Sequence, residues 1–203
     1  MGNSEHEHQE HRHNTNDDHA HGEHAHPGHG KEGHVHDASC AVAHGDAVAP
    51  AEEKVLVAVF ATPVARYLLR YGADAGYRPV LIEPDAERAK EGADGFELAD
   101  GVTGFAADRT DLVVTDHHRP ELGVQLRDAL KAGTRWVGIM GNPRHQAPHV
   151  AALTDLGVPP SEISKVHRPI GLNIGSHTPA EIAIATLAGL IADRNGKPGG
   201  FEF

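Results

Sequence analysis

The sequence predicts an α/β protein with a Rossmann-like, doubly wound parallel sheet, preceded by a disordered tail rich in histidine. Between residues 50 and 203, short unbroken apolar runs alternate with segments of helical periodicity. Strands of a parallel sheet are buried on both faces and read as such runs, and helical crossovers connect them. Residues 1–49 differ, because they hold 12 of the 18 histidines, nine acidic residues and two basic ones, without any apolar period. We therefore predict two parts, a disordered acidic tail over 1–49 and one Rossmann-like domain over 50–203.

Apolar runs predict the strands of the sheet, at 54–60, 78–83, 96–98, 111–115 and 135–140. Ligands of doubly wound sheets bind beyond the carboxyl ends of the strands. The groups that follow the four main runs are therefore candidate site residues: Phe60-Ala61-Thr62, Glu83 with Asp85, Asp116-His117-His118 and Gly141-Asn142-Pro143-Arg144-His145.

Helices are predicted between these strands, at 62–76, 85–90, 120–130, 142–157 and 179–194. The last has the strongest start signal, since Thr178 suits its cap, Pro179 its first position and Glu181 the third position after the cap. Pairs of the same kind, Thr62-Pro63 and Asn142-Pro143, are predicted to begin two other helices.

A loop with two glycines leads into the last helix, at residues 169–178. Backbone N–H groups and the helix dipole make a helix N-terminus a ready anion site. The loop is therefore a candidate anion site, although glycines such as Gly171 and Gly175, taken alone, are more typical of plain turns. The same two interpretations, ligand contact or ordinary structural residue, apply to five polar residues: His117, His118, Arg144, His167 and Arg168.

Composition excludes several classes of function. The predicted domain holds 20 acidic and 16 basic residues without a basic stripe, which argues against nucleic-acid binding. No apolar run reaches the ~18 residues of a membrane span, and the N-terminus lacks a basic region followed by an apolar one. Cys40 is the only cysteine, and no activated nucleophile or pair of carboxylates stands out. We expect a cytoplasmic protein without nucleic-acid or membrane partners.

Histidines of the tail occur in pairs separated by one residue, a pattern that chelates Ni²⁺, Zn²⁺, Cu²⁺ or Co²⁺. The predicted metal ligands are His6, His8, His11, His13, His19, His21, His24, His26, His34 and His36. One function that follows is metal trafficking, with the tail as the carrier. The alternative is that the tail is a low-complexity segment whose histidines have no dedicated function.

Three segments within residues 111–194 resemble the C-terminal domain of the XdhC/CoxI family, the maturation factors of molybdenum hydroxylases such as xanthine dehydrogenase and carbon monoxide dehydrogenase. Residues 111–118 resemble a family strand that ends in a Thr-(Asp/His)-His turn. Residues 136–144 resemble the family's aromatic-x-Gly-x-(Leu/Met)-Gly-Ser-x-(Arg/Lys) segment. Residues 166–183 resemble its His-x-Pro-Ile-Gly-Leu-x-Ile-Gly loop and the Thr-Pro-x-Glu-Ile-Ala helix start.

The resemblance implies an accessory protein rather than an enzyme. It would bind molybdenum cofactor (molybdopterin), assist its sulfuration by a cysteine desulfurase and deliver it to an apo molybdenum hydroxylase. Because members of the family often form oligomers, the resemblance also implies a homodimer. The predicted cofactor contacts are Asp116, His117, His118, Gly141, Asn142, Arg144, Gly171, Asn173, Gly175 and Thr178.

The chain departs from the family after the first strand, where Phe60-Ala61-Thr62-Pro63-Val64 replaces Phe-Gly-x-Gly-His. Without glycine a pyrophosphate cannot approach the backbone closely, so we do not expect NAD(P) or FAD in the usual pose. The alternative function on this fold is a nicotinamide-dependent oxidoreductase, with Glu83 or Asp85 as the ribose-binding acid.

Overall fold

The computed structural model describes residues 38–45, 53–142, 144 and 146–200. The chain divides after Ala49 into two units, and each is described by itself. In the first unit, α1 spans Ala38–Ala43, within the segment predicted to be a disordered tail. Its alanine-rich sequence has a high helix propensity, although it lacks an apolar period. The ten histidines predicted to bind metal lie outside the described residues.

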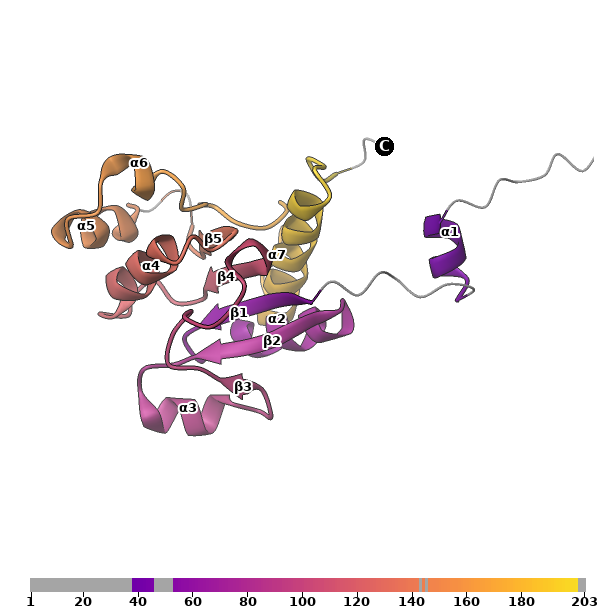
Figure 1. Ribbon diagram of the computed structural model, residues 1–203, viewed down its shortest axis with the longest axis horizontal. Coiled ribbons are helices and arrows are strands. Elements are labelled where there is room, and N and C mark those ends of the chain that lie inside the picture. The colour runs from indigo at the N-terminus through magenta and orange to yellow at the C-terminus, as the bar shows by residue number, and fades with distance from the viewer. Residues whose placement is uncertain (1–37, 46–52, 143, 145, 201–203) are drawn as a thin grey trace, which may run out of the picture. The chain divides into compact units, whose positions relative to one another are not determined.

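The second unit is built on a five-stranded, all-parallel sheet in the order β3-β2-β1-β4-β5, which confirms the predicted Rossmann-like class (Figure 1). The strands are β1 (Lys54–Val59), β2 (Tyr77–Ile82), β3 (Glu97–Leu98), β4 (Thr110–Val114) and β5 (Trp136–Ile139). Val59 lies opposite both Ile82 and Val114, so β1, β2 and β4 end at one level. The strand order reverses between β1 and β4, and this is the position where such sheets bind ligands.

Helices cover both faces of the sheet (Figure 1). On one face, α2 (Pro63–Asp74) and α7 (Pro179–Arg194) pack against each other and on Leu56, Val113 and Trp136. On the other face, α4 (Leu122–Lys131) and α5 (Pro148–Asp155) cover a core that includes Phe60 and Ile139. The unbroken apolar strands thus lie between two helical layers, as their composition predicts.

Short elements complete the unit: α3 (Ala86–Gly92), the 3₁₀ turn η1 (Ala107–Arg109) and α6 (Pro160–Ile163). His167 extends the sheet beyond β5 by one parallel bridge to Gly138, in which its N–H donates to the Val137 carbonyl at 2.9 Å. Its imidazole stacks on the Trp136 indole with centroids 4.8 Å apart. His167 therefore has a structural role at this edge of the sheet.

The structure confirms two predicted helix caps and corrects a third. Thr62 accepts the Ala65 N–H at the start of α2, and Thr178 forms a capping box with Glu181 at the start of α7. Asn142 does not begin a helix, because its side chain accepts the Arg144 N–H and forms a local turn. The helix predicted from Asn142 begins at Pro148 instead.

Gly72 lies within α2, where a Cβ would be 2.5 Å from a methyl of Leu56. Close packing of the helix on β1 therefore explains this glycine.

The opposite edge of the sheet, where the strands begin, holds a structural charge cluster. The buried carboxylate of Asp111 binds Arg135 at 2.6 Å and Arg194 at 2.7 Å, and it ties α7 to β4 and β5. Burial and the nearby Asp111 raise the pKa of Tyr77 to about 12. Among the described residues, no helix is both long enough and apolar enough to cross a bilayer.

Candidate functional site

The carboxyl ends of the strands carry the candidate site, and its first component is a buried ion pair. Glu83, at the end of β2, has a fully buried side chain that faces Arg119 from the segment after β4. Arg119 donates to both carboxylate oxygens, at 2.9 and 3.3 Å. Glu83 also accepts the backbone N–H groups of Ala61 at 2.9 Å and Asp85 at 3.0 Å. Both oxygens of this carboxylate are therefore fully engaged within the protein.

The backbone after β1 is shaped to reach this pair. Phe60 adopts a positive φ of 75°, which is rare for a bulky side chain. Its ring is completely buried, and the Arg119 guanidinium lies 4.8 Å from the ring centroid. The turn at Phe60 directs the Ala61 N–H to Glu83. The strained backbone of Phe60 and its buried ring therefore lie next to the Glu83–Arg119 ion pair.

Hydroxyl groups close the position where the strand order reverses. Thr62 after β1 and Thr115 after β4 have their Oγ1 atoms 3.0 Å apart. The same Thr115 oxygen lies 2.9 Å from the carbonyl oxygens of Val59 and Phe60. The crevice between β1 and β4 is thus bridged by side chains of the protein itself.

Within the protein, these contacts engage the acid that binds the ribose of a dinucleotide in many such folds. The acid at the end of the second strand normally binds the ribose diol, whereas Glu83 is held by Arg119 and two N–H groups. Asp85, two residues further on, caps α3 by accepting the Glu87 and Arg88 N–H groups. Gly92 of α3 packs so closely that a Cβ there would lie 2.4 Å from the Ala61 methyl.

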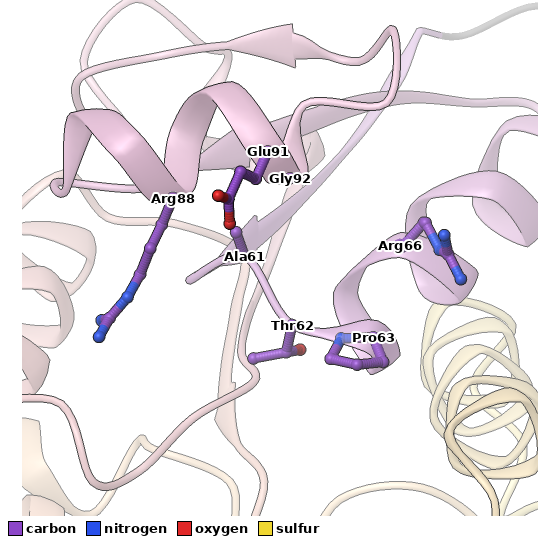
Figure 2. Close-up of a pocket in the computed structure, with 7 residues that line it drawn as sticks. All are labelled: Ala61, Thr62, Pro63, Arg66, Arg88, Glu91 and Gly92. Atoms are coloured by element: carbon purple, nitrogen blue, oxygen red, sulfur yellow. The ribbon is translucent and has the colours of Figure 1, made fainter.

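A pocket of about 260 Å³ lies beside this closed crevice, between the start of α2 and α3 (Figure 2). Its lining residues are Ala61, Thr62, Pro63, Arg66, Arg88, Glu91 and Gly92. Figure 2 shows Arg66 on α2 and Arg88 on α3, so the two guanidinium groups come from different helices. The lining carries two cationic groups and one acidic group beside the positive end of α2.

The second component of the site is a cluster of histidines and arginine after β4 and β5. The His117 and His118 rings lie with centroids 4.0 Å apart, and the His118 N–H donates to Asp116 at 2.9 Å. Burial lowers the pKa of His117, and electrostatic repulsion from His118 and Arg168 lowers it further. A backbone hydrogen bond to Met140 links this turn to the end of β5.

Arg168 organises the loop after β5. It donates to the Asn142 carbonyl at 2.8 Å, and its Nε would lie 2.9 Å from a Cβ at Gly141. Glycine at 141 therefore makes room for the guanidinium. Arg168 thus brings the turn after β4, the loop after β5 and the segment before Gly171 to one place.

His149 adds a buried group that the sequence analysis did not identify. It lies in the first turn of α5 and is only 5% exposed. Burial lowers its pKa, and the charge of Arg168 adds to the shift. Within the described part of the chain, its Nδ1 atom has no hydrogen-bond partner. A buried polar atom without a partner is unusual in a folded protein and marks this position for a ligand or water.

The glycine loop before α7 packs against that helix. Gly171 has a φ of 83°, and a Cβ there would lie 3.0 Å from the backbone of Ala185 and Thr186. The Leu172 N–H donates to the Ala185 carbonyl at 3.0 Å. Gly171 therefore lets the loop pack on the middle of α7, about two turns from its N-terminus.

The N-terminus of α7 already holds an anion, the carboxylate of Glu181. This carboxylate accepts the His177 N–H at 2.8 Å and the Thr178 N–H at 3.0 Å. These backbone hydrogen bonds lower the pKa of Glu181. The anion site predicted at this helix end is thus filled by the chain itself.

The predicted contacts therefore fall into two groups. The structure gathers Asp116, His117, His118, Gly141 and Asn142 around Arg168, with exposed Arg144 in the following turn. Gly171 and Thr178 are used in packing and capping, and Asn173 and Gly175 are exposed. Within the described ranges, no group of three or more potential ligands is placed to hold a metal ion.

Arg119 and His149 are the residues that sequence reasoning missed. An acid that ends a buried strand needs a partner, but nothing in the sequence locates that partner 36 residues away. His149 had a usable signal, because it precedes the buried Leu153 by four residues, on the same face of a helix.

Strand order, crossovers and the position of the site define a Rossmann-like α/β domain whose ribose-binding position is occupied by its own Glu83–Arg119 pair. Residues 56–190 match the XdhC Rossmann domain, which covers more than half of the chain. The chain therefore belongs to the XdhC family.

Two further comparisons found similar proteins. The protein called uncharacterized protein YqeB, from Escherichia coli (strain K12), is 31% identical over 108 residues. That match covers 53% of this chain but only 19% of the relative, so the chain spans a small part of it. A crystal structure described as a xanthine dehydrogenase from Bacillus halodurans superposes with a TM-score of 0.58 at 20% identity. The superposition covers 72% of this chain and 46% of the Bacillus halodurans chain, and it shows that the two share a fold.

Proposed function

We propose that this protein is an accessory factor for the maturation of a molybdenum hydroxylase, and that it binds molybdenum cofactor at the cluster around Arg168. Membership of the XdhC family supports this proposal. The name of the Bacillus halodurans protein, a xanthine dehydrogenase, supports a hydroxylase of that class as the partner. The observation that carries the proposal is the buried, unpartnered Nδ1 of His149 next to the charge of Arg168.

The donors of this cluster suit an anionic, phosphorylated pterin. Arg144 and Arg168 supply positive charge and planar N–H donors for phosphate. His117 and His149 have lowered pKa values, so both are neutral near pH 7 and present one donor and one acceptor each. When bound, the molybdenum cofactor supplies the metal centre that the hydroxylase requires. The residues of this chain would bind it, orient it and exclude water from it until delivery.

Several features oppose the alternative of a nicotinamide-dependent oxidoreductase. The ribose-binding acid is held by Arg119, and Thr62 and Thr115 bridge the crevice at which the nicotinamide half would enter. We expect no shift of the melting temperature with NAD⁺ or NADP⁺. A clear shift would favour the oxidoreductase.

The proposal is tested by anaerobic gel filtration of the full chain with molybdenum cofactor, with molybdenum measured in the protein fraction. The unmodified protein should retain the cofactor, and His149→Leu and Arg144→Gln should retain at least tenfold less. Arg127→Gln is the matched control, because Arg127 is on α4 and paired with Asp128. Equal retention by all three variants, or no retention by the parent, would overturn the proposal.

A role of the tail in metal trafficking is a separate hypothesis that follows from its histidine pairs. Deletion of residues 1–49 distinguishes the two functions. If cofactor retention survives the deletion but delivery of Ni²⁺ or Zn²⁺ fails, the tail acts in metal supply. If retention fails as well, the tail contributes to cofactor binding.

A further inference from the structure

We infer that ligand binding at the cluster around Arg168 is coupled to the uptake of one proton, which is held on Nδ1 of His149. This inference rests on the proposed function, because it concerns the same site and the same anionic ligand. It adds regulation by pH to that site. The ligand is held more tightly in mildly acidic solution and is released as the pH rises.

The His149 imidazole is buried, and no hydrogen bond fixes the protonation of its inner nitrogen. The residue is 5% exposed, and Nδ1 has no hydrogen-bond partner among the described residues. In a folded protein, the hydrogen bonds of the two ring nitrogens set where an imidazole carries its protons. Because Nδ1 of His149 makes no such bond within the described part of the chain, a ligand can set the protonation of this ring.

The surroundings of His149 keep the ring neutral in the free protein. Burial lowers the pKa of the imidazole, and the charge of Arg168 lowers it further. The residue also lies in the first turn of α5, where the positive end of the helix dipole disfavours another positive charge. The free protein therefore presents a neutral imidazole near pH 7.

Charged groups on the neighbouring helices supply no counter-ion for His149. The helices in closest contact with α5 are α4 and α6, and their charged residues, with the residue that precedes α4, are Glu121, Arg127, Asp128, Lys131 and Glu162. The carboxylates among them already face basic residues: Glu121 faces Arg119 at 3.5 Å, Asp128 faces Arg127 at 2.8 Å and Glu162 faces Lys165 at 2.7 Å. Asp155 of α5 itself lies at the other end of the helix from His149. An anion that binds beside Arg168 is therefore the group that can offset the charge of a protonated His149.

A bound phosphate reverses the effect of Arg168 on His149. When its oxygens pair with Arg168, they offset the positive charge that opposes protonation, and an anion close to an imidazole favours the charged form. The pKa of His149 should therefore be higher in the complex than in the free protein. Linkage then requires the affinity to fall as the pH rises between these two pKa values, by at most about tenfold per pH unit for one proton.

The test is anaerobic equilibrium dialysis of the full chain against molybdenum cofactor at several pH values between about 6 and 8. His149→Gln is the decisive variant, because glutamine keeps a polar side chain but takes up no proton. The ratio of the affinities at the two ends of this range should be at least about threefold smaller in His149→Gln than in the parent. The phosphate of the ligand also titrates in this range, but it does so equally in every variant, so the difference between variants reports His149. His177→Gln is the matched control, since His177 is exposed, and it should keep the pH dependence of the parent.

A second measurement does not depend on a variant that folds. Nuclear magnetic resonance of the labelled His149 ring in the parent should give a higher pKa with cofactor than without it. Equal values, or the same pH dependence of binding in His149→Gln and the parent, would overturn this inference and leave the proposed function standing. Absence of cofactor binding by the parent at every pH would overturn the proposed function, and this inference with it.

Discussion

Arg119 donates both terminal nitrogens to the buried carboxylate of Glu83, and this pair joins the ends of β2 and β4 across the end of β1. The Arg119 side chain is 10% exposed and the Glu83 side chain 0% exposed, so both charged groups are shielded from bulk water. Removal of either partner of such a buried pair lowers the stability of the fold, because the remaining charge stays buried without a counter-ion. The position that binds ribose in related folds is here a structural element.

Replacement of Glu83 by glutamine should lower the free energy of unfolding by about 3 kcal/mol, because the Arg119 charge loses its counter-ion. Urea denaturation followed by circular dichroism measures this change. Glu97→Gln is the control, since it breaks the exposed Arg78–Glu97 pair on β2 and β3. We expect a much smaller effect there, and equal effects would contradict a special role for the buried pair.

Substitution of Gly138 by alanine should destabilise the fold by about 1–3 kcal/mol through overpacking. A Cβ at this position would lie 2.2 Å from the Trp136 ring and 2.8 Å from Ile170. Trp136 is the only tryptophan, so its fluorescence reports the displaced ring directly. Gly101→Ala, at an open position, should change neither stability nor emission. An unchanged spectrum in Gly138→Ala would show that the ring is not packed as described.

The two loop glycines before α7 should respond differently to alanine. Both have positive φ, 83° at Gly171 and 68° at Gly175, so each substitution carries a conformational cost of about 1–2 kcal/mol. Only Gly171 also contacts the backbone of α7. Thermal denaturation should therefore show a larger loss for Gly171→Ala than for Gly175→Ala. Similar losses would mean that the loop does not depend on its contact with α7.

Stability should fall as the pH drops below about 6.5, the ordinary pKa of histidine. Burial, followed by nearby positive charge, lowers the pKa of His149 and His117 in the folded state. The unfolded chain therefore binds more protons between these lowered values and pH 6.5, and stability rises with pH in that window. The slope contributed by each histidine is at most about 1.4 kcal/mol per pH unit.

The variant His149→Leu isolates one part of this pH dependence. Urea denaturation at several pH values between 5 and 8 should give a shallower slope for the variant than for the parent. His177→Leu is the control, because His177 is exposed. A slope that is unchanged in His149→Leu would show that His149 is protonated to the same extent in the folded and unfolded states.

The sequence by itself determined the order and class of the elements. Apolar runs placed β1, β2, β4 and β5, and the Thr-Pro pairs placed the starts of α2 and α7. These features depend on propensity, capping and burial pattern, which act between residues close together in the chain. Where a local signal had two possible uses, the prediction was wrong. Asn142 forms a turn rather than a cap because its side chain can satisfy either kind of backbone group.

Only the tertiary structure decided what the candidate site residues do. Glu83 is paired with a residue 36 positions away, and Gly171 packs against the backbone of α7, a helix that begins after the loop. His149 became part of the site because it is buried within range of the Arg168 charge. The physical reason is common to all three: charge pairing, close backbone approach and desolvation are set by groups brought together from distant parts of the chain, and no local pattern encodes which groups will meet.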